Sequence, residues 1–417
     1  MKRILILSLL ICFFLVGKAQ TELFTTSTEQ SIPYRIPAIA MVKDGSLVAV
    51  SDYRHCRFDI GAGRIDFHFR RSTDNGRTWG EIYSPATMQG DGDLTPGHQE
   101  AGFGDAAIVA DRKSKRVLLI SCSGGPLFGQ STIEHHQGMA RFYSEDGGKT
   151  WGKPAYIGEE TIYQPLAQGK YGAIKAWFVG SGRIFQSRTV RVGKYYRLYC
   201  AGVSRNDGGN ANWVIYSDDF GESWQVLGGC DASPVPGGDE PKCEELPDGR
   251  LLISSRAWGG RYYNIFTFTD VRCGEGQWGQ MAFSGKTNNG VEANQNACNG
   301  EVMLVPVKRV SDKKKTYLLL QSLPFGPGRS NVGIWYKELS SPSDYDTPEA
   351  LAANWTGRYQ VTQLPSAYST MIMQRDRSLG FFYEEETHCG TKGGGYTMVY
   401  RNLTIEEITD GKYKARK

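Results

Sequence analysis

The chain has 417 residues, of which 51 are glycine and 12% are aromatic, a composition that excludes disordered, collagen-like and coiled-coil proteins. Its formal net charge is +4, and removing the three basic residues of the first 19 leaves +1, which excludes bulk electrostatic attraction to nucleic acid or to an anionic membrane. The length suits one large domain or two or three ordinary ones, and the excess of glycine and aromatic residues predicts many short strands joined by tight turns.

Residues 1–19 predict a signal peptide. A basic start at Lys2 and Arg3 precedes an apolar run over residues 4–17, and small residues lead up to Ala19. The run is short for a membrane span, although an uncleaved anchor is the alternative. We therefore expect an exported protein, periplasmic, surface-bound or secreted, with no transmembrane segment in its mature chain.

Short apolar runs along the rest of the chain predict strands of four to eight residues. Asp-Gly pairs at 44–45 and 248–249 precede two of them and indicate hairpin turns. The one persuasive helical stretch is 347–354, with a proline near its start. The clearest strand-like runs are 46–51, 117–122, 196–203, 251–256, 317–322 and 380–383.

Three segments share the pattern S-x-D-x-G-x-[TS]-W, and each follows an apolar strand. They begin at Ser72, Ser144 and Ser217, at spacings of 72 and 73 residues, and a degenerate fourth copy covers 269–278. In such a turn the Asp accepts hydrogen bonds from backbone amides, the Gly takes a positive φ, and the Trp packs beneath. We assign these Asp residues a structural role.

A repeat near 70 residues suits a four-stranded propeller blade with long loops. The 398 residues of 20–417, divided by six, give about 66 per blade. The repeats therefore predict an all-β fold, a six-bladed β-propeller of four-stranded antiparallel blades. One domain over 20–417 leaves no room for a second of normal size.

The cysteines and histidines do not indicate a metal or redox site. None of the eight cysteines after residue 19 has CxxC spacing, and several lie in apolar strands, so we expect mostly buried free thiols. The pair His135-His136 lacks metalloprotease spacing and is expected in a surface loop. We predict no metal and no cofactor.

The three turn repeats resemble the Asp boxes of sialidases, and other segments from about residue 33 to the end resemble that family too. The family is one of exported bacterial exo-sialidases, which hydrolyse glycosides with retention. The matching segments are YRIP at 34–37, DEP at 239–241, SSR at 254–256, PGR at 327–329, SAYS at 366–369 and GFFYE at 380–384.

The resemblance implies that Arg35, Arg256 and Arg329 bind the carboxylate of a sialic acid. Planar guanidinium groups suit that task, because they bind a carboxylate through paired hydrogen bonds. A lone arginine is more often a surface salt-bridge partner, but these three lie in family motifs. The resemblance also implies that Glu384 holds Arg35 in place.

Tyr368 and Glu240 match the family's nucleophile and its base. A carboxylate nucleophile would repel the substrate's own carboxylate, whereas a phenol is neutral. Because the pKa of tyrosine is near 10, the phenol needs a base at hand. The neighbouring Asp239 leaves open which of the two carboxylates faces Tyr368.

Asp59 occupies the position of the family's acid/base residue, on a loop ahead of the first Asp box. Asp52 and Asp66 are the alternatives, although each has a structural place at or in a strand. Arg54 and Asp105 match family positions near the sugar's 4-hydroxyl, and either could instead form a loop salt bridge.

The resemblance therefore implies an exo-α-sialidase, a glycoside hydrolase acting on sialylated glycoproteins, glycolipids or oligosaccharides. A trans-sialidase shares the same catalytic residues and differs in water access. A non-catalytic Asp-box propeller that binds glycan or protein is the third possibility. We expect no nucleic-acid partner.

Overall fold

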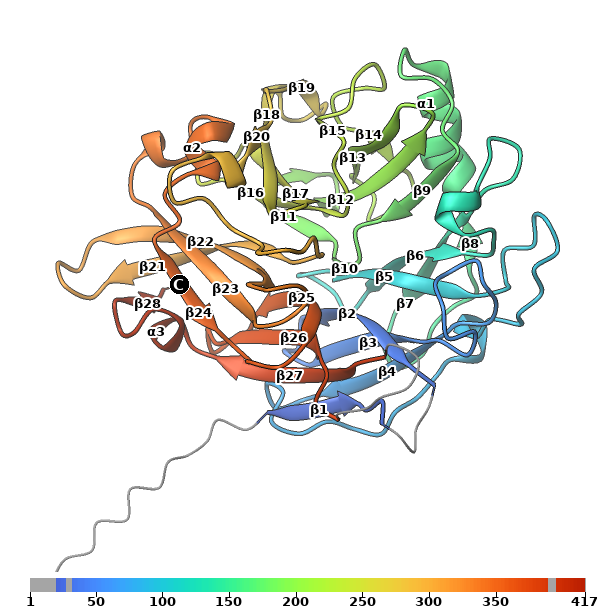
Figure 1. The fold of residues 1–417 in the computed structure, drawn as a ribbon, viewed down its shortest axis with the longest axis horizontal. Helices are drawn as coiled ribbons and strands as arrows, with labels where there is room; N and C mark the ends of the chain where they lie inside the picture. The colour runs from blue at the N-terminus through green and yellow to red at the C-terminus, as the bar shows by residue number, and fades with distance from the viewer. Residues whose placement is uncertain (1–19, 28–31, 389–394, 417) are drawn as a thin grey trace, which may run out of the picture.

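The strands of the protein form six sheets arranged in a ring around a central axis (Figure 1). The structure is a computed structural model and describes residues 20–27, 32–388 and 395–416. The predicted six-bladed β-propeller is confirmed. The expected signal peptide at 1–19 lies outside the described residues.

Blades 1 to 3 follow one another along the first half of the chain. Blade 1 contains β2 (Tyr34–Met41), β3 (Leu47–Tyr53) and β4 (Asp66–Ser72). Blade 2 contains β5 (Phe103–Ala110), β6 (Val117–Ser123), β7 (Gly138–Ser144), β8 (Ala155–Tyr156) and the parallel β10 (Gly182–Arg183). Blade 3 contains β9 (Ala176–Val179), β11 (Phe185–Val192), β12 (Tyr195–Asn206), β13 (Gly209–Ser217), β14 (Gln225–Val226) and β15 (Val235–Pro236).

Blades 4 to 6 complete the ring. Blade 4 contains β16 (Pro241–Glu245), β17 (Leu251–Ala257), β18 (Gly260–Asp270), β19 (Glu275–Trp278) and β20 (Ala282–Phe283). Blade 5 contains β21 (Val302–Arg309), β22 (Lys315–Pro324), β23 (Val332–Leu339), β24 (Gly357–Gln360) and β28 (Tyr413–Ala415). Blade 6 contains β25 (Ser366–Met373), β26 (Leu379–Glu385), β27 (Thr397–Leu403) and β1 (Thr21–Phe24).

The two ends of the chain are paired into the ring. β1 adds to β27 as an antiparallel neighbour, so that blade 6 combines strands from both ends of the chain (Figure 1). β28 pairs with β21 of blade 5. These pairings close the ring through main-chain hydrogen bonds and cover strand edges that would otherwise be exposed.

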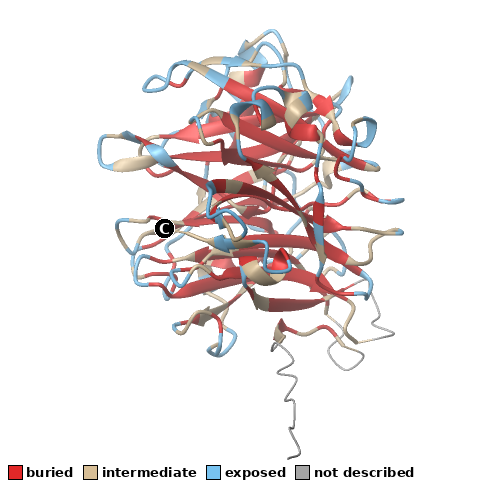
Figure 2. Cartoon of the chain, turned by 90° about the vertical axis from the view of Figure 1, so that its left-hand side faces the viewer, coloured by how far each residue is buried: buried red, intermediate tan, exposed pale blue. Residues whose placement is uncertain are grey.

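Most of the hydrophobic core lies in six large clusters, one between each pair of adjacent blades, and two smaller clusters complete it. Most blade strands are therefore buried on both faces, as the side view shows (Figure 2). This explains the continuous apolar runs in the sequence, because a strand between two neighbours does not alternate apolar and polar residues.

All six predicted strand runs are strands in the structure, and both Asp-Gly pairs form turns. The Asp boxes have the expected geometry. Asp74 accepts hydrogen bonds from Thr78 N at 2.9 Å and Thr78 Oγ1 at 2.7 Å, and Trp79 Nε1 donates to Gly76 O at 3.1 Å.

The degenerate copy at 269–278 does not form a box. Its Asp270 accepts hydrogen bonds from the backbone N–H groups of Arg272 and Cys273. Trp278 Nε1 donates to the carbonyl of Leu227 and not to a carbonyl within its own turn. Arg272 occupies the position that Gly holds in the boxes, and the glycine with a positive φ, Gly274, comes two residues later.

The predicted helix is α2 (Pro348–Ala352), capped by the Thr347 hydroxyl. The sequence did not indicate the short helical segments elsewhere, which are η1 (Ala86–Met88), η2 (Phe128–Gln130), η3 (Glu159–Tyr163), α1 (Gln164–Gln168), η4 (Ser284–Lys286), η5 (Pro342–Asp344) and α3 (Ile405–Ile408). They are too short to show a helical period. Within the described residues, no helix has the length and apolar character needed to cross a membrane.

Blade 1 departs from the expected four strands. Its outer edge is a single bridge between Phe69 and Tyr83, because Pro85 follows closely and cannot donate a main-chain hydrogen bond. The sheets of blades 2 to 5 carry one or two additional short strands.

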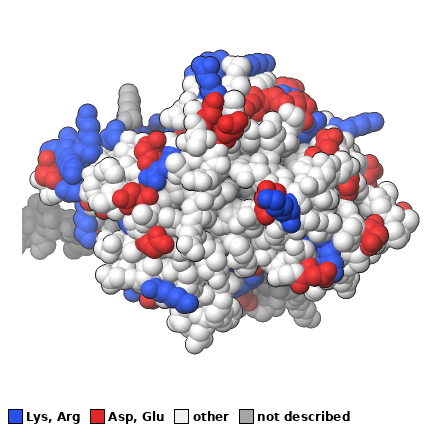
Figure 3. Space-filling view, turned by 90° about the horizontal axis from the view of Figure 1, so that it is seen from above, with Lys and Arg blue, Asp and Glu red and all other residues white. Residues whose placement is uncertain are grey.

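The seven cysteines in the described part of the chain are free, and four of them are buried, as expected. Cys389 lies outside the described residues. Acidic and basic side chains are interspersed on the edge of the ring seen in Figure 3, in keeping with a mature charge near zero.

Candidate active site

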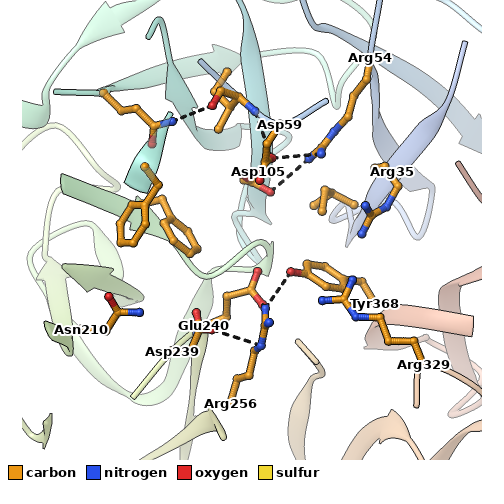
Figure 4. Close-up of a pocket in the computed structure, with 15 residues that line it drawn as sticks. Arg35, Arg54, Asp59, Asp105, Asn210, Asp239, Glu240, Arg256, Arg329 and Tyr368 are labelled. Atoms are coloured by element: carbon orange, nitrogen blue, oxygen red, sulfur yellow. Dashed lines mark hydrogen bonds and ion pairs between the residues drawn. The ribbon is translucent and has the colours of Figure 1, made fainter. Parts of the chain in front are cut away.

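A cavity of about 320 Å³ lies where strands of several blades begin (Figure 4). Three strands contribute a side chain near their first residue, namely Arg35 from β2, Asp105 from β5 and Tyr368 from β25, whereas Arg256 comes from near the end of β17. The predicted residues that line the cavity are Arg35, Arg54, Asp59, Asp105, Glu240, Arg256, Arg329 and Tyr368.

Glu384 lies behind the cavity wall and connects two of these residues. Its carboxylate accepts from Arg35 Nε at 2.8 Å and from Arg35 Nη2 at 3.3 Å. The same carboxylate accepts from the backbone N–H of Ile36 at 2.7 Å and of Tyr368 at 3.0 Å. Ile36 has a φ of 62°, a strained value for a β-branched residue, so Glu384 holds β2 and β25 in a locally unfavourable but defined arrangement.

Arg256 joins the two residues predicted to act as base and nucleophile. Its Nη1 donates to Glu240 Oε2 at 2.7 Å and to Tyr368 Oη at 3.2 Å. Glu240 and Tyr368 are both largely buried. Burial, followed by the charge of Glu240, raises the pKa of Tyr368 well above its usual value, so the phenol is protonated at neutral pH.

Asp239 contacts the other side of the same guanidinium. Its Oδ2 lies 3.2 Å from Arg256 Nε, and its Oδ1 accepts from Glu240 N at 2.9 Å. Burial and the charge of Glu240 raise the pKa of Asp239. Glu240 is the carboxylate whose charge acts on Tyr368, whereas Asp239 supports Arg256.

Arg35 and Arg329 flank the ring of Tyr368. The guanidinium carbon of each lies 5.5 Å from the ring centroid. Arg35 is paired with Glu384, but no carboxylate of the described residues lies within ion-pair distance of Arg329. Three arginines from three blades therefore surround one phenol, and one of them lacks a counter-charge (Figure 4).

Three carboxylates surround Arg54 on the opposite wall. The guanidinium lies 2.9 Å from Asp52, 3.0 Å from Asp59 and 3.8 Å from Asp105. The side chain of Asp59 is 59% exposed, whereas that of Asp52 is fully buried. Asp59 is therefore the one of the three that is open to solvent.

The two alternatives to Asp59 have structural partners. Asp66 accepts from His55 Nε2 at 2.9 Å, from Arg64 Nη2 at 2.9 Å and from the backbone of Gly90, outside the cavity. Asp52 accepts from Arg54 and from the backbone N–H of Asp105. Neither lines the cavity.

Asp105 is a strained and buried member of this wall. Its φ is 56°. Burial, then the charges of Asp59 and Asp52, raises its pKa well above the usual value. Burial likewise raises the pKa of Asp52 to about 6, against the opposing charge of Arg54. A cluster of carboxylates around one cation is typical of functional sites.

Sequence reasoning missed one wall of the cavity. Phe128 and Phe178 form an edge-to-face pair with centroids 4.8 Å apart, and Gln137 and Asn210 lie beside them. Arg205 fixes the loop that carries Phe128 by donating to its backbone carbonyl at 2.9 Å. These four residues come from loops and strand ends of blades 2 and 3 and carry no local motif.

The described residues contain no group of three His, Cys, Asp or Glu side chains that could hold a metal ion. Of the histidine pair, His136 contacts Glu159 Oε1 at 2.7 Å and stacks on Tyr163, which is a structural contact.

Comparison with known proteins agrees with the motifs. A sialidase from Micromonospora viridifaciens is 30% identical over 241 residues, which cover 54% of this chain and 32% of that protein. The chain thus spans about a third of the length of this curated relative. No family model matches. The resemblance to bacterial sialidases is confirmed.

Solved structures share the same fold over nearly the whole chain. A Hadza microbial sialidase has a TM-score of 0.70 at 21% identity, covering 94% of this chain and 69% of its own. An intramolecular trans-sialidase from Ruminococcus gnavus has a TM-score of 0.70 at 16% identity, covering 94% and 98%. At these identities the likeness shows the fold alone, the propeller of a sialidase.

Proposed function

We propose that this protein is an exo-α-sialidase, a glycoside hydrolase that removes terminal sialic acids from glycoconjugates with retention. The observation that carries the proposal is the convergence of Arg35, Arg256 and Arg329 on the phenol of Tyr368. A site with this much positive charge around a neutral nucleophile suits a substrate whose reacting carbon bears a carboxylate.

The three arginines have different tasks in substrate binding. Arg35 is held rigidly by Glu384, so it presents a fixed donor. Arg329, which has no carboxylate partner among the described residues, gains one when the substrate binds. Because the substrate carboxylate enters between them, its binding costs little reorganisation of either side chain.

Arg256 couples substrate binding to activation of the nucleophile. Its guanidinium donates hydrogen bonds to both Glu240 and Tyr368. The arriving carboxylate competes for this guanidinium and weakens its bond to Glu240. The freed carboxylate of Glu240 then accepts the phenol proton of Tyr368 as the phenolate oxygen attacks the anomeric carbon.

Asp59 acts as the acid/base residue. It donates a proton to the departing glycosidic oxygen as the bond between that oxygen and the anomeric carbon breaks. In the second half-reaction the ionised Asp59 takes a proton from water, and the water oxygen displaces the Tyr368 oxygen from the anomeric carbon. The departing Tyr368 oxygen takes its proton back from Glu240, and sialic acid is released with the original anomeric configuration. The exposed position of Asp59 in the cavity lining supports this role, since there it can reach both substrate and solvent.

We also propose that residues 1–19 are a signal peptide and that 20–417 form a single exported catalytic domain. The substrates are sialylated glycoproteins, glycolipids or oligosaccharides.

Proton NMR of a reaction with 3′-sialyl-lactose tests the proposal. The α-anomer of free sialic acid is expected as the first product, before it mutarotates. First appearance of the β-anomer would overturn the retaining mechanism, and sialic acid transferred to added lactose would identify a trans-sialidase. No turnover, with binding retained, would favour a non-catalytic propeller.

A further inference from the structure

A second cavity, of about 620 Å³, lies between blades 4 and 5. It is larger than the candidate active site and within the range of about 300–1,000 Å³ that small-molecule sites occupy. Glu292, Arg358 and Gln360 at its edge are exposed, so solvent reaches it.

The two cavities are lined by neighbouring residues of the same segments. Arg256, near the end of β17, lines the first cavity, and Gly259, in the turn between β17 and β18, lines the second. The loop between β22 and β23 carries Arg329 in the first and Gly326 in the second (Figure 1). Its Gly328 N–H donates to Asn294 O at 3.0 Å, so the loop is fixed to the far wall. The two cavities therefore lie next to each other along these two segments.

Aromatic side chains form the floor of this second cavity. Phe325 and Trp335 pack edge to face with ring centroids 5.6 Å apart. Arg358 lies over both rings, with its guanidinium carbon 5.8 Å from the Trp335 centroid. Among the described residues, Trp335 Nε1 is buried without a hydrogen-bond partner. Phe325 and Trp335 are both half-buried, so part of their ring surface remains accessible to the C–H groups of a ligand.

The remaining wall is rich in amide groups. Gln360 Nε2 donates to Asn331 Oδ1 at 3.0 Å, and Asn331 Nδ2 donates to Gly326 O at 2.7 Å. Asn294 and Gln295 are exposed at the opposite wall. One acidic and one basic residue, Glu292 and Arg358, leave the lining without net charge.

An exposed tryptophan stands beside the boundary between the cavities. Trp258 lies in the β17–β18 hairpin, between Arg256 and Gly259, and is 71% exposed, the largest exposed fraction among the large apolar side chains of the described residues. Exposing the apolar indole ring of Trp258 to water is unfavourable. The turn itself does not need this side chain, because the positive φ that the turn requires is at Gly259.

We propose that the second cavity is a binding site for an uncharged sugar, an internal residue of the same glycan whose sialic acid occupies the first cavity. Aromatic faces bind the C–H face of a pyranose and amides bind its hydroxyls, while the balanced charge disfavours a second sialic acid. Trp258 supports the chain of sugars between the cavities. The inference rests on the proposed function, because that function supplies the anchored end of the glycan.

Kinetics on two substrates test the use of this cavity. An aryl sialoside fills only the first cavity, whereas a sialylated lacto-N-tetraose reaches the second. Trp258→Ala and Trp335→Ala are each expected to lower kcat/KM for the oligosaccharide about five-fold and to leave the aryl sialoside within about two-fold. Val271→Ala, an exposed apolar residue at the opposite end of the same blade, is the matched control. An unchanged ratio between the substrates for both variants would overturn the proposal.

A binding measurement separates this inference from the proposed function. Saturation-transfer NMR with uncharged lacto-N-tetraose is expected to detect contact with the Tyr368→Phe protein, and Trp335→Ala in that background is expected to abolish it. Thermal melts identify a variant that fails to fold, and Arg358→Ala, at an exposed position, then takes the place of Trp335→Ala. Loss of contact with lacto-N-tetraose in the variant supports the site even if sialoside turnover is absent. No contact with the parent protein refutes the site even if turnover is normal.

Discussion

At the scale of single residues, the arrangement of Arg256 is the most informative feature of the candidate active site. Its guanidinium donates hydrogen bonds to both Glu240 and Tyr368, the residues that we propose as base and nucleophile. Buried charges of this kind are costly unless they are paired, and Glu240 provides the opposite charge for Arg256. Three predictions test the residue roles.

Tyr368→Phe is expected to lower kcat on an aryl sialoside by about 1,000-fold or more, because the nucleophilic oxygen is gone. Steady-state fluorescence assays measure the loss. Tyr413→Phe, which removes a phenol bonded to Glu338 outside the cavity, is the control and is expected to leave kcat unchanged. Near-normal turnover by Tyr368→Phe would refute the mechanism.

Glu240→Gln is expected to reduce kcat by about 100- to 10,000-fold, the range for loss of a general base. Asp239→Asn is the matched control, since it has the same neighbour, Arg256, but does not act on the phenol. We expect it to raise KM more than it lowers kcat, because it loosens a substrate-binding arginine. If Asp239→Asn causes the larger fall in kcat, the assignment of the base is wrong.

Asp59→Asn is expected to slow hydrolysis of sialyl-lactose by about 100-fold and that of an aryl sialoside by less than about ten-fold. A phenol leaves readily without a proton, whereas a sugar hydroxyl does not. The ratio of the two kcat/KM values is the measurement, with Asp93→Asn, an exposed carboxylate away from the cavity lining, as the control. Equal loss on both substrates would contradict an acid role.

At the scale of elements, the Asp box is a turn held by one carboxylate. In the first box, Asp74 accepts from the Ser72 hydroxyl as well as from the Thr78 amide and hydroxyl. These hydrogen bonds, of which the one from the Thr78 amide has the largest effect, lower the pKa of Asp74 to about 2. The box therefore joins the third strand of its blade to the segment that follows, at a position remote from the cavity lining.

Asp74→Ala is expected to lower the free energy of unfolding by about 1 kcal/mol. The loss is modest because water replaces some of the hydrogen bonds that the exposed turn groups made to the Asp74 carboxylate. Because the folded pKa lies below the unfolded one, the ionised group stabilises the fold above pH 4, and this stabilisation is lost as pH falls toward 2. Urea titrations at pH 7 and pH 2.5 measure the effect. The difference between variant and parent should shrink at low pH, and Asp346→Ala, at an exposed turn, should show none.

At the scale of the whole molecule, stability depends on closing the ring. Six blades share six interblade clusters, and the cluster between blades 6 and 1 includes residues of the first described strand. Phe24 is fully buried there, 5.3 Å from the ring of Tyr34 and 6.3 Å from that of Phe382.

Phe24→Ala is expected to cost about 3–5 kcal/mol of unfolding free energy, the usual cost of removing a buried phenylalanine. Chemical denaturation measures it. Thr21→Ala on the same strand keeps the pairing of β1 with β27 and removes no buried ring, so we expect a change below about 1 kcal/mol. A small effect of Phe24→Ala would show that the ring is stable without this strand.

The sequence by itself determined the features that depend on neighbours along the chain. The apolar runs, the Asp-Gly turns and the three Asp boxes each depend on residues within about ten positions of one another. The spacing of the boxes was then enough to predict six blades. The family motifs further identified eight of the residues that line the cavity, including Arg35 and Tyr368.

The tertiary structure alone decided what depends on residues far apart in the chain. Arg256 reaches Tyr368 across 112 positions, and Glu384 reaches Arg35 across 349. The aromatic wall at Phe128 and Phe178 and the second cavity beside Trp335 are likewise made by loops of neighbouring blades. No local pattern encodes such contacts, because packing of one blade on the next sets which loops meet and which side chains remain without a partner.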